Sequence, residues 1–190
     1  MITMDITKFY LTPDDAALFI IDVQDSLFNS MEYEMRKKVA KNVGILIELA
    51  KQYSLPIILT EQYRKGLGPT IKELMDRLEG VVGFDKLTFD CMKDDPIREQ
   101  VARIKRSNII VCGIETHICV LTTALSLLKE NYNVIIASDA VCSRRTHEWE
   151  MAIHALRQAG TIVYPTETIA FMMLEKAGTE RFKKLSPLFK

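Results

Sequence analysis

Short apolar runs alternate with longer amphipathic stretches over most of these 190 residues. The run at 17–23 reads as a buried strand, whereas the stretch at 34–53 has apolar residues at helical spacing. This alternation is typical of a parallel sheet with helices on both faces. We therefore expect an α/β protein with a doubly wound, three-layer arrangement.

The pattern predicts six strands and four main helices. Pro96 suits a first helical turn, and Gly160 is placed to end a helix. The expected strands are residues 17–23, 56–60, 83–86, 108–112, 133–138 and 161–164, and the expected helices are residues 34–53, 96–105, 116–130 and 147–159.

Composition and charge narrow the class of protein. A 48% hydrophobic content without a Pro-, Gly- or Ser-rich linker fits a single compact domain over residues 1–190. Lys plus Arg and Asp plus Glu both number 25, so no global field attracts nucleic acid or anionic lipid. The chain begins without a basic segment and an apolar run, and no apolar run approaches the roughly 18 residues of a membrane span. We expect a cytoplasmic protein without nucleic-acid or membrane partners.

The four cysteines suggest free thiols, because they form neither a CxxC pair nor a tight framework. Cys119 stands out, since a buried strand should pass into a helix around it. Unpaired N–H groups and the helix dipole at such a position favour the ionised thiol. Cys119 is therefore a candidate nucleophile, whereas Cys112 lies inside an apolar run and is expected to pack in the core.

Two charged residues are expected near Cys119. Ligands of doubly wound sheets bind at the carboxyl ends of the strands, where Asp22 ends the first strand and Lys86 the third. A thiol with an ordinary pKa near 8.5 needs a base or a cation for activation. Asp22 can accept the thiol proton and Lys86 can hold the thiolate. Plainer roles remain open, since Asp22 can cap a turn and Lys86 can be solvated.

Several other kinds of site do not fit the sequence. No P-loop string occurs, and residues 66–71 lack the third glycine of a dinucleotide fingerprint. A thiol phosphatase needs an arginine six residues after its cysteine, but Leu125 follows Cys119 and Glu148 follows Cys142 at that spacing. Cys142 is expected in a loop at the same sheet edge, where it can approach the site or, more commonly, pack in the core.

The sequence also gives little support for a metal-binding or catalytic histidine. The three histidines, His117, His147 and His154, fall on or beside expected helices without a carboxylate at ligand spacing. His117 lies two residues before Cys119, and such residues do not face each other on a helix. We expect structural roles for all three.

Three segments resemble the signatures of the isochorismatase-like cysteine hydrolase family, in that family's order. They are LFIIDVQ at 18–24, FDK at 84–86 and CGIETHICV at 112–120, and a further segment, LTEQYRKGLGPT at 59–70, resembles the branch of isochorismatase domain-containing proteins. The resemblance implies a six-stranded parallel sheet in the order 3-2-1-4-5-6 and a catalytic triad of Asp22, Lys86 and Cys119. It also implies a non-proline cis peptide bond between Ile114 and Glu115, and a homo-oligomer.

The expected reaction is hydrolysis of a C–N bond, in an amide or ureido-type small molecule, through a thioester intermediate. Backbone N–H groups of Glu115 and Cys119 are the expected oxyanion donors. Residues close to the triad in sequence are weaker candidates for substrate contacts, and these are Gln24, Phe28, Tyr63, Thr88 and Phe89.

Departures from other members of the family narrow the chemistry further. Members that act on isochorismate lack the nucleophilic cysteine, so Cys119 argues against that substrate. Nicotinamidases carry an Asp and His metal cluster after the second strand, whereas residues 60–63 contain no histidine. We therefore expect neither a metal nor another cofactor.

A binding or scaffold protein with a vestigial site is the alternative. Its support is the tail at 167–190, which mixes apolar and charged residues, and a set of methionines able to form adaptable apolar surface. Those methionines are Met31, Met35, Met151, Met172 and Met173. Ordinary core packing explains both features equally well.

Overall fold

Residues 6–190, which the computed structural model describes, contain a six-stranded sheet in which every strand pair is parallel. The strand order is β3-β2-β1-β4-β5-β6. The strands are β1 (Ala16–Ile21), β2 (Ile57–Gln62), β3 (Phe84–Lys86), β4 (Asn108–Ile114), β5 (Asn133–Cys142) and β6 (Ile162–Tyr164). The predicted sheet and strand order are confirmed.

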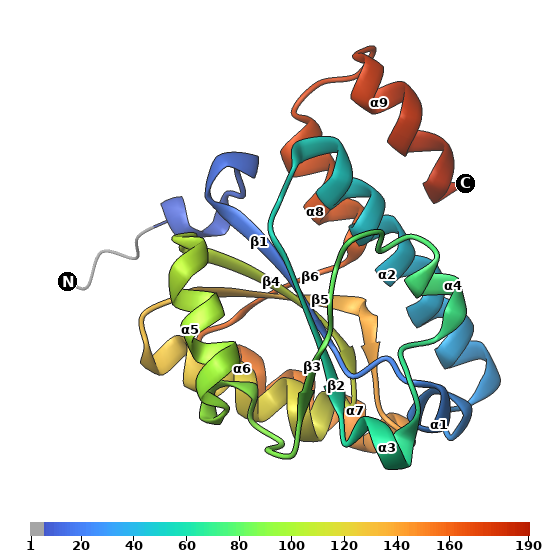
Figure 1. Cartoon of the computed structure of the whole chain (residues 1–190). Helices are drawn as coiled ribbons and strands as arrows, with labels where there is room; N and C mark the ends of the chain where they lie inside the picture. The colour runs from blue at the N-terminus through green and yellow to red at the C-terminus, as the bar shows by residue number, and fades with distance from the viewer. Residues whose placement is uncertain (1–5) are drawn as a thin grey trace.

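Helices cover both faces of this sheet (Figure 1). The helices are α1 (Asp25–Asn29), α2 (Tyr33–Tyr53), α3 (Arg64–Leu67), α4 (Lys72–Met75), α5 (Asp95–Ile104), α6 (Leu121–Lys129), α7 (Thr146–Ala159), α8 (Thr166–Leu174) and α9 (Glu180–Leu185). In Figure 1, α2 and α8 lie on one side of the sheet, and α5, α6 and α7 lie on the other. The expected three-layer arrangement is therefore confirmed.

Strand β1 contributes to a hydrophobic core on each face of the sheet, because successive side chains of a strand point to opposite faces. Leu18 and Ile20 join one buried cluster, whereas Phe19 and Ile21 join the other. Burying each such side chain contributes about 1.5–3 kcal/mol. A continuous apolar run is thus what a central strand between two helical layers requires.

The structure differs from the expected elements at the site edge of the sheet. Strand β5 continues to Cys142, so this cysteine lies in the strand and not in a loop after it. The expected helix at 116–130 begins with a π-helical turn, Thr116–Val120, before α6. Apolar periodicity does not show where a strand ends or whether a helix begins with a π-helical turn, because the same residues are buried against the core in either case.

Part of the tail after residue 166 packs against the hydrophobic core and is not exposed as a partner-binding segment would be. Ile169 and Met173 of α8 are buried in the core, and Leu185 of α9 joins them. Core packing therefore explains this part of the tail. Of the methionines offered as adaptable surface, Met31 is also buried, whereas Met151 is about half exposed.

Gly113 allows two strands to approach closely beside the site. Its φ is 122°, and a Cβ at this position would lie 1.9 Å from the carbonyl oxygen of Ile21. The register between β4 and β5 also shifts between Val111 and Gly113. Only glycine fits this position, which directs the chain into the turn that carries Cys119.

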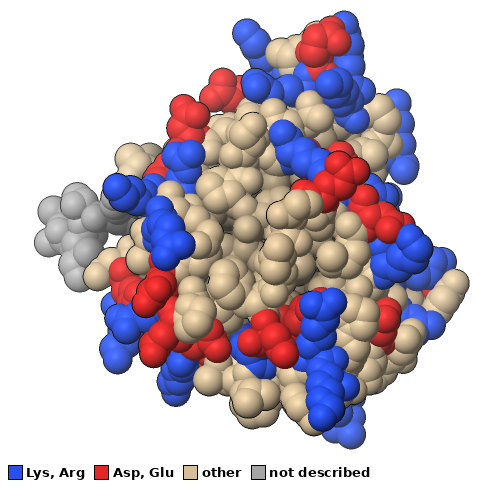
Figure 2. All heavy atoms as spheres, in the orientation of Figure 1, with Lys and Arg blue, Asp and Glu red and all other residues tan. Residues whose placement is uncertain are grey.

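Charge is mixed over the face seen in Figure 2, where uncharged side chains occupy the centre and both signs of charge lie around the rim. Within residues 6–190, no helix is both long and apolar enough to cross a membrane. The assignment of residues 1–190 to one domain stays a prediction.

Candidate active site

Asp22 is positioned by an unusual backbone conformation at the end of β1. Its φ is 53°, a left-handed value that aspartate tolerates better than most residues. The residue is fully buried, and its backbone N–H donates to the carbonyl of Thr60 at 3.1 Å. The Thr60 hydroxyl donates to Asp22 Oδ1 at 2.8 Å. Two hydrogen bonds with Thr60 of β2 therefore hold Asp22 at the carboxyl ends of the strands.

Lys86, the last residue of β3, makes a buried ion pair with Asp22. Its Nζ donates to Asp22 Oδ2 at 2.7 Å, to Gln62 Oε1 at 2.6 Å and to the carbonyl of Thr88 at 3.1 Å. Burial lowers the pKa of Lys86, but Asp22 together with Cys91 and Cys119 more than offsets burial, and the pKa lies above its ordinary value. The side chain is therefore an ammonium ion at neutral pH.

Cys119 lies in the π-helical turn and completes the cluster. Its Sγ is 3.9 Å from Lys86 Nζ, which also donates to Asp22 Oδ2. Burial, and then the negative charge of Asp22, raise the pKa of the Cys119 thiol well above its ordinary value, although Lys86 opposes this. The expectation that the helix start favours the thiolate stays a prediction, and the raised pKa favours the protonated thiol.

The turn before Cys119 contains a cis peptide bond between Ile114 and Glu115, at the position that the resemblance implies. The Glu115 carbonyl accepts hydrogen bonds from the N–H groups of Ile118 at 3.1 Å and Val120 at 3.3 Å. The Glu115 carboxylate is held by Arg144, whose backbone N and Nε donate to Oε2 at 3.1 and 3.0 Å. The side chain of Glu115 is thus engaged with the segment after β5.

Three of the five weaker candidates contact the cluster or its supports. Gln24 bonds to Gln62, and the Tyr63 N–H donates to the carbonyl of Lys86 at 2.9 Å. The Thr88 carbonyl accepts from Lys86, and the Thr88 hydroxyl oxygen is buried without a hydrogen-bond partner in the described part of the chain.

The two predicted phenylalanines lie in different surroundings. Phe89 is 61% exposed and lines a cavity of about 510 Å³ together with Thr88 and Thr122. Because the Thr88 carbonyl accepts from Lys86 Nζ, this cavity lies beside the cluster, although none of the three clustered residues lines it. Phe28 instead lines a cavity of about 380 Å³ beside Arg36, and none of the three clustered residues lines that cavity.

Sequence reasoning missed three residues of the cluster: Thr60, Gln62 and Cys91. Thr60 and Gln62 alternate along β2, which places both side chains on one face, and Gln62 is paired in register with Lys86. That alternation was a usable signal. Burial raises the pKa of the Cys91 thiol to about 12, and Cys91 Sγ lies 3.9 Å from the Thr60 hydroxyl.

Cys142 and His117 do not join this cluster. Cys142 packs in the hydrophobic core on the α2 side of the sheet, whereas Cys119 belongs to the hydrophobic core on the opposite face. Burial raises the pKa of the Cys142 thiol to about 12. His117 Nδ1 is 2.9 Å from the Ser143 hydroxyl, and its Nε2 is 3.9 Å from Glu148. His117 therefore links the π-helical turn to the segment leading into α7.

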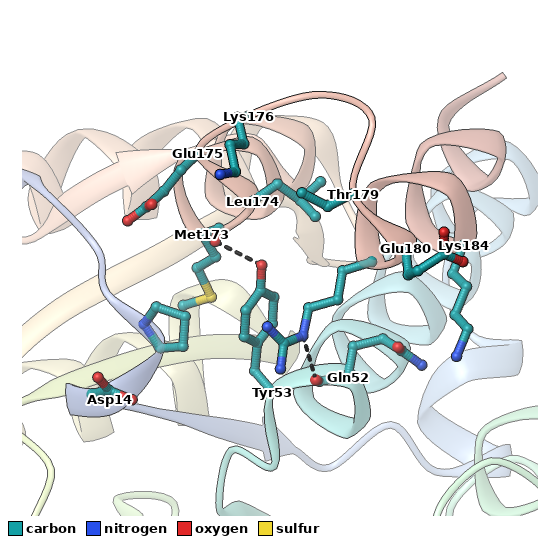
Figure 3. Close-up of a pocket in the computed structure, with 12 residues that line it drawn as sticks. Asp14, Gln52, Tyr53, Met173, Leu174, Glu175, Lys176, Thr179, Glu180 and Lys184 are labelled. Carbon is teal, nitrogen blue, oxygen red and sulfur yellow. Dashed lines mark hydrogen bonds between the residues drawn. The ribbon is translucent and has the colours of Figure 1, made fainter.

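A cavity of about 600 Å³ lies at the opposite ends of the strands from the candidate site (Figure 3). Asp14 and Tyr53, which line it, precede β1 and β2, so the cavity is at the amino ends of the strands. Tyr53 donates to the Met173 carbonyl at 2.7 Å. Over residues 6–190, no three His, Cys, Asp or Glu side chains are grouped so that they could hold a metal ion.

The site's sequence matches a known family over most of the chain. Residues 16–168 match the model of the isochorismatase domain. The chain is 34% identical over 184 residues to the secreted isochorismatase effector Isc1 of Phytophthora sojae, covering 95% of this chain and 87% of that relative. It is 30% identical over 182 residues to isochorismatase domain-containing protein 2A of Mus musculus, covering 95% and 85%.

Solved structures agree with this match. A structure described as the MAR1 ribonuclease of Caenorhabditis elegans has a TM-score of 0.86 and 33% identity, covering 94% of this chain and 91% of that one. The YcaC gene product of Escherichia coli, described as an octameric hydrolase of unknown specificity, has a TM-score of 0.87 and 25% identity, covering 95% and 89%. This chain therefore belongs to the isochorismatase family, close to the branch of isochorismatase domain-containing proteins.

Proposed function

We propose that this protein is a cysteine-dependent hydrolase of a C–N bond, with Asp22, Lys86 and Cys119 as its catalytic triad. One observation carries the proposal: the buried ammonium of Lys86 lies 2.7 Å from the buried carboxylate of Asp22 and 3.9 Å from the buried thiol of Cys119. Burying an ion pair costs several kcal/mol per ion before the attraction between the charges is counted, so hydrophobic packing alone would not favour this arrangement. Clusters of this kind are typical of functional sites.

Asp22 is the proton carrier in the proposed mechanism. It takes the proton of Cys119 as the sulfur attacks the substrate carbonyl carbon, which gives a tetrahedral oxyanion. Asp22 then returns the proton to the nitrogen, the C–N bond breaks and ammonia or an amine leaves a thioester on Cys119. Asp22 next deprotonates a water molecule that attacks the thioester, and the acid product leaves as the thiol regains its proton.

The raised pKa of Cys119 bears on the timing of the first step. Because the resting thiol is protonated, the proton moves to Asp22 together with sulfur attack, and no stored thiolate is required. Lys86 keeps its charge throughout, since its pKa is raised and its ammonium is surrounded by oxygen acceptors. It stabilises the negative charge that develops on sulfur.

Backbone N–H groups of Glu115 and Cys119 are the proposed donors to the oxyanion. The unpaired Thr88 hydroxyl is the proposed contact for a polar substrate group, with Phe89 beside it. Gln24 and Tyr63 act through Gln62 and the backbone of Lys86. Phe28 is the weakest of the five candidates, because it lines a different cavity.

The test is ammonia release from a panel of small primary amides, ureido compounds and aromatic carboxamides. We expect activity in the wild-type protein and none in Cys119→Ser or Asp22→Asn. Alkylation of Cys119 by iodoacetamide, mapped by peptide mass spectrometry, should slow in Lys86→Met. Equal inactivity of the wild type and Cys119→Ser across the panel would favour a binding protein with a vestigial site.

RNA cleavage is a second candidate, favoured by the similarity to the structure described as the MAR1 ribonuclease. The balanced charge of this chain, 25 basic against 25 acidic residues, argues against it. A labelled single-stranded RNA should stay intact under the conditions of the amide assay. Cleavage that disappears in Cys119→Ser would replace the C–N substrate with RNA.

We also propose a cytoplasmic homo-oligomer that works without a metal or another cofactor. The octameric relative supports the oligomer, whereas the secreted relative shows that location varies among similar proteins. Light scattering of the purified chain tests the oligomer, and dialysis against a chelator should leave amide hydrolysis unchanged.

A further inference from the structure

Gln62 occupies a central place beside the triad, although the proposed reaction assigns it no chemical step. It is the last residue of β2, and Lys86 is its register partner at the end of β3. Side chains of register partners in a parallel pair point to the same face, so the amide and the ammonium meet side by side. Gln62 Oε1 accepts from Lys86 Nζ at 2.6 Å.

The orientation of the Gln62 amide follows from its second contact. Its Nε2 donates to the Leu87 carbonyl at 2.9 Å, and a carbonyl accepts only from the NH₂ end of an amide. The oxygen must therefore face the ammonium.

The ammonium of Lys86 has three N–H donors and four acceptors around it: the oxygens Asp22 Oδ2, Gln62 Oε1 and the Thr88 carbonyl, and the more distant Cys119 Sγ at 3.9 Å. Only Asp22 carries a charge. Gln62 thus satisfies a donor without adding a second anion near Cys119, whose pKa the negative charge of Asp22 already raises.

The backbone of Gln62 is itself held by Gln24. Gln24 Oε1 accepts from the Gln62 N–H at 2.6 Å, and Gln24 Nε2 donates to the Gln62 carbonyl at 3.0 Å and to the Gly68 carbonyl at 2.7 Å. Gln24 is buried and follows Asp22 by two residues. The Gln24 side chain, from the segment after β1, therefore fixes the backbone of Gln62 beside Lys86.

We propose that Gln62 is a positioning residue that holds the Lys86 ammonium between Asp22 and Cys119. It acts through Lys86 and touches no reacting atom. This inference rests on the proposed function only for the identity of the nucleophile, and it is tested on the thiol itself. The titratable groups that act on Cys119 are Asp22 after β1, Lys86 in β3 and Cys91 before α5.

The experiment measures the rate of Cys119 carboxamidomethylation by iodoacetamide between pH 6 and 10, with peptide mass spectrometry. Variants are compared by the pH at which this rate reaches one-tenth of the wild-type rate at pH 10, which we call the pH midpoint of alkylation. Gln62→Met keeps the side-chain length but removes both hydrogen bonds, so the ammonium is held less firmly. We expect the pH midpoint of alkylation to rise by about one unit, which makes the reaction about tenfold slower at neutral pH. In a Lys86→Met background, Gln62→Met should cause no further shift.

Gln52→Met is the matched control, since Gln52 lines the cavity at the opposite edge of the sheet, and its midpoint should equal that of the wild type. If Gln62→Met does not fold, Gln62→Asn replaces it, because its amide oxygen falls short of the ammonium, and the same rise is expected. A lower melting temperature with an unchanged or lowered pH midpoint would show a merely structural role and overturn the inference.

The two proposals fail separately in this design. A raised midpoint in the Gln62 variants supports the inference even if no amide is hydrolysed, which would count against the C–N hydrolase alone. A wild-type midpoint in the Gln62 variants overturns the inference even if amides are hydrolysed.

Discussion

Two lysine–carboxylate pairs at different places in this protein have the same separation and different surroundings. Lys86 Nζ and Asp22 Oδ2 are 2.7 Å apart with both side chains fully buried. Lys183 Nζ and Glu180 Oε1, in α9, are also 2.7 Å apart, but their side chains are 63% and 81% exposed. The distance alone therefore does not indicate how much an ion pair contributes to stability. Water screens the charges of the α9 pair, whereas the buried pair depends on neighbouring polar groups.

The buried pair also has a supporting network that the exposed pair lacks. Thr60 donates to Asp22, while Gln62 and the Thr88 carbonyl accept from Lys86. A buried charge without such partners costs far more than an exposed one. The comparison predicts that changes near Lys86 alter both stability and thiol reactivity, whereas changes in α9 alter neither strongly.

The largest expected effect comes from removing one member of each pair. Lys86→Met leaves Asp22 as an unpaired buried charge, and we expect the free energy of unfolding to fall by about 3–5 kcal/mol. Lys183→Met should change it by less than about 0.5 kcal/mol. Urea denaturation followed by circular dichroism measures both. Equal losses in the two variants would contradict the comparison.

A smaller effect is expected from the hydroxyl groups near each pair. Thr60→Val removes the donor to Asp22 Oδ1 and should cost about 1–3 kcal/mol, because a buried charged acceptor loses its partner. Thr179→Val removes the side chain that caps α9 by accepting from the Phe182 N–H, which should cost about 1 kcal/mol. The same urea titrations apply. Thr60→Val should also slow Cys119 alkylation, and a change of that rate in Thr179→Val would weaken the contrast.

The smallest effect per site is a pH dependence of stability caused by the buried thiols. The pKa values of Cys91 and Cys142 are raised to about 12, so the folded state retains these protons after the unfolded chain loses them. Stability is therefore full below about pH 8.5 and falls above it, by about 1.4 kcal/mol per pH unit for each thiol. Lys86, whose pKa is also raised, acts in the same direction.

Denaturation at pH 9 and pH 10 measures this slope. Cys142→Ala should reduce the loss between these two values by about 1 kcal/mol relative to the wild type, whatever its effect at pH 7. A slope that is the same in Cys142→Ala and the wild type would show that burial does not hold the thiol proton.

The sequence predicted the sheet well because its strands are buried on both faces and appear as apolar runs. The weakest run, at 83–86, still contains β3 at Phe84–Lys86. Strand ends were less predictable: β5 continues to Cys142 because parallel pairing with β4 resumes after the register shift. Pairing depends on the neighbouring strand, which the local pattern does not contain.

The candidate site was predicted in part. Asp22, Lys86 and Cys119 were expected at one edge because all three follow or end strands, and the structure brings them into contact. Thr60 and Gln62 were missed although their alternation along β2 places both on one face, because the contact of Gln62 with Lys86 depends on the pairing of β2 with β3. The raised pKa of the Cys119 thiol was also missed, because it depends on burial and on the neighbouring charge of Asp22.

Residue order alone determined the layered α/β architecture and the residue types at the sheet edge, because apolar periodicity and the strand-end rule are local properties of the chain. Tertiary structure decided the contacts made by those residues. The left-handed turn at Asp22, the register of Gln62 with Lys86 and the separate faces of Cys119 and Cys142 arise from packing between distant segments. Electrostatic effects change with distance and burial, so the charge states of the site follow from the folded molecule alone.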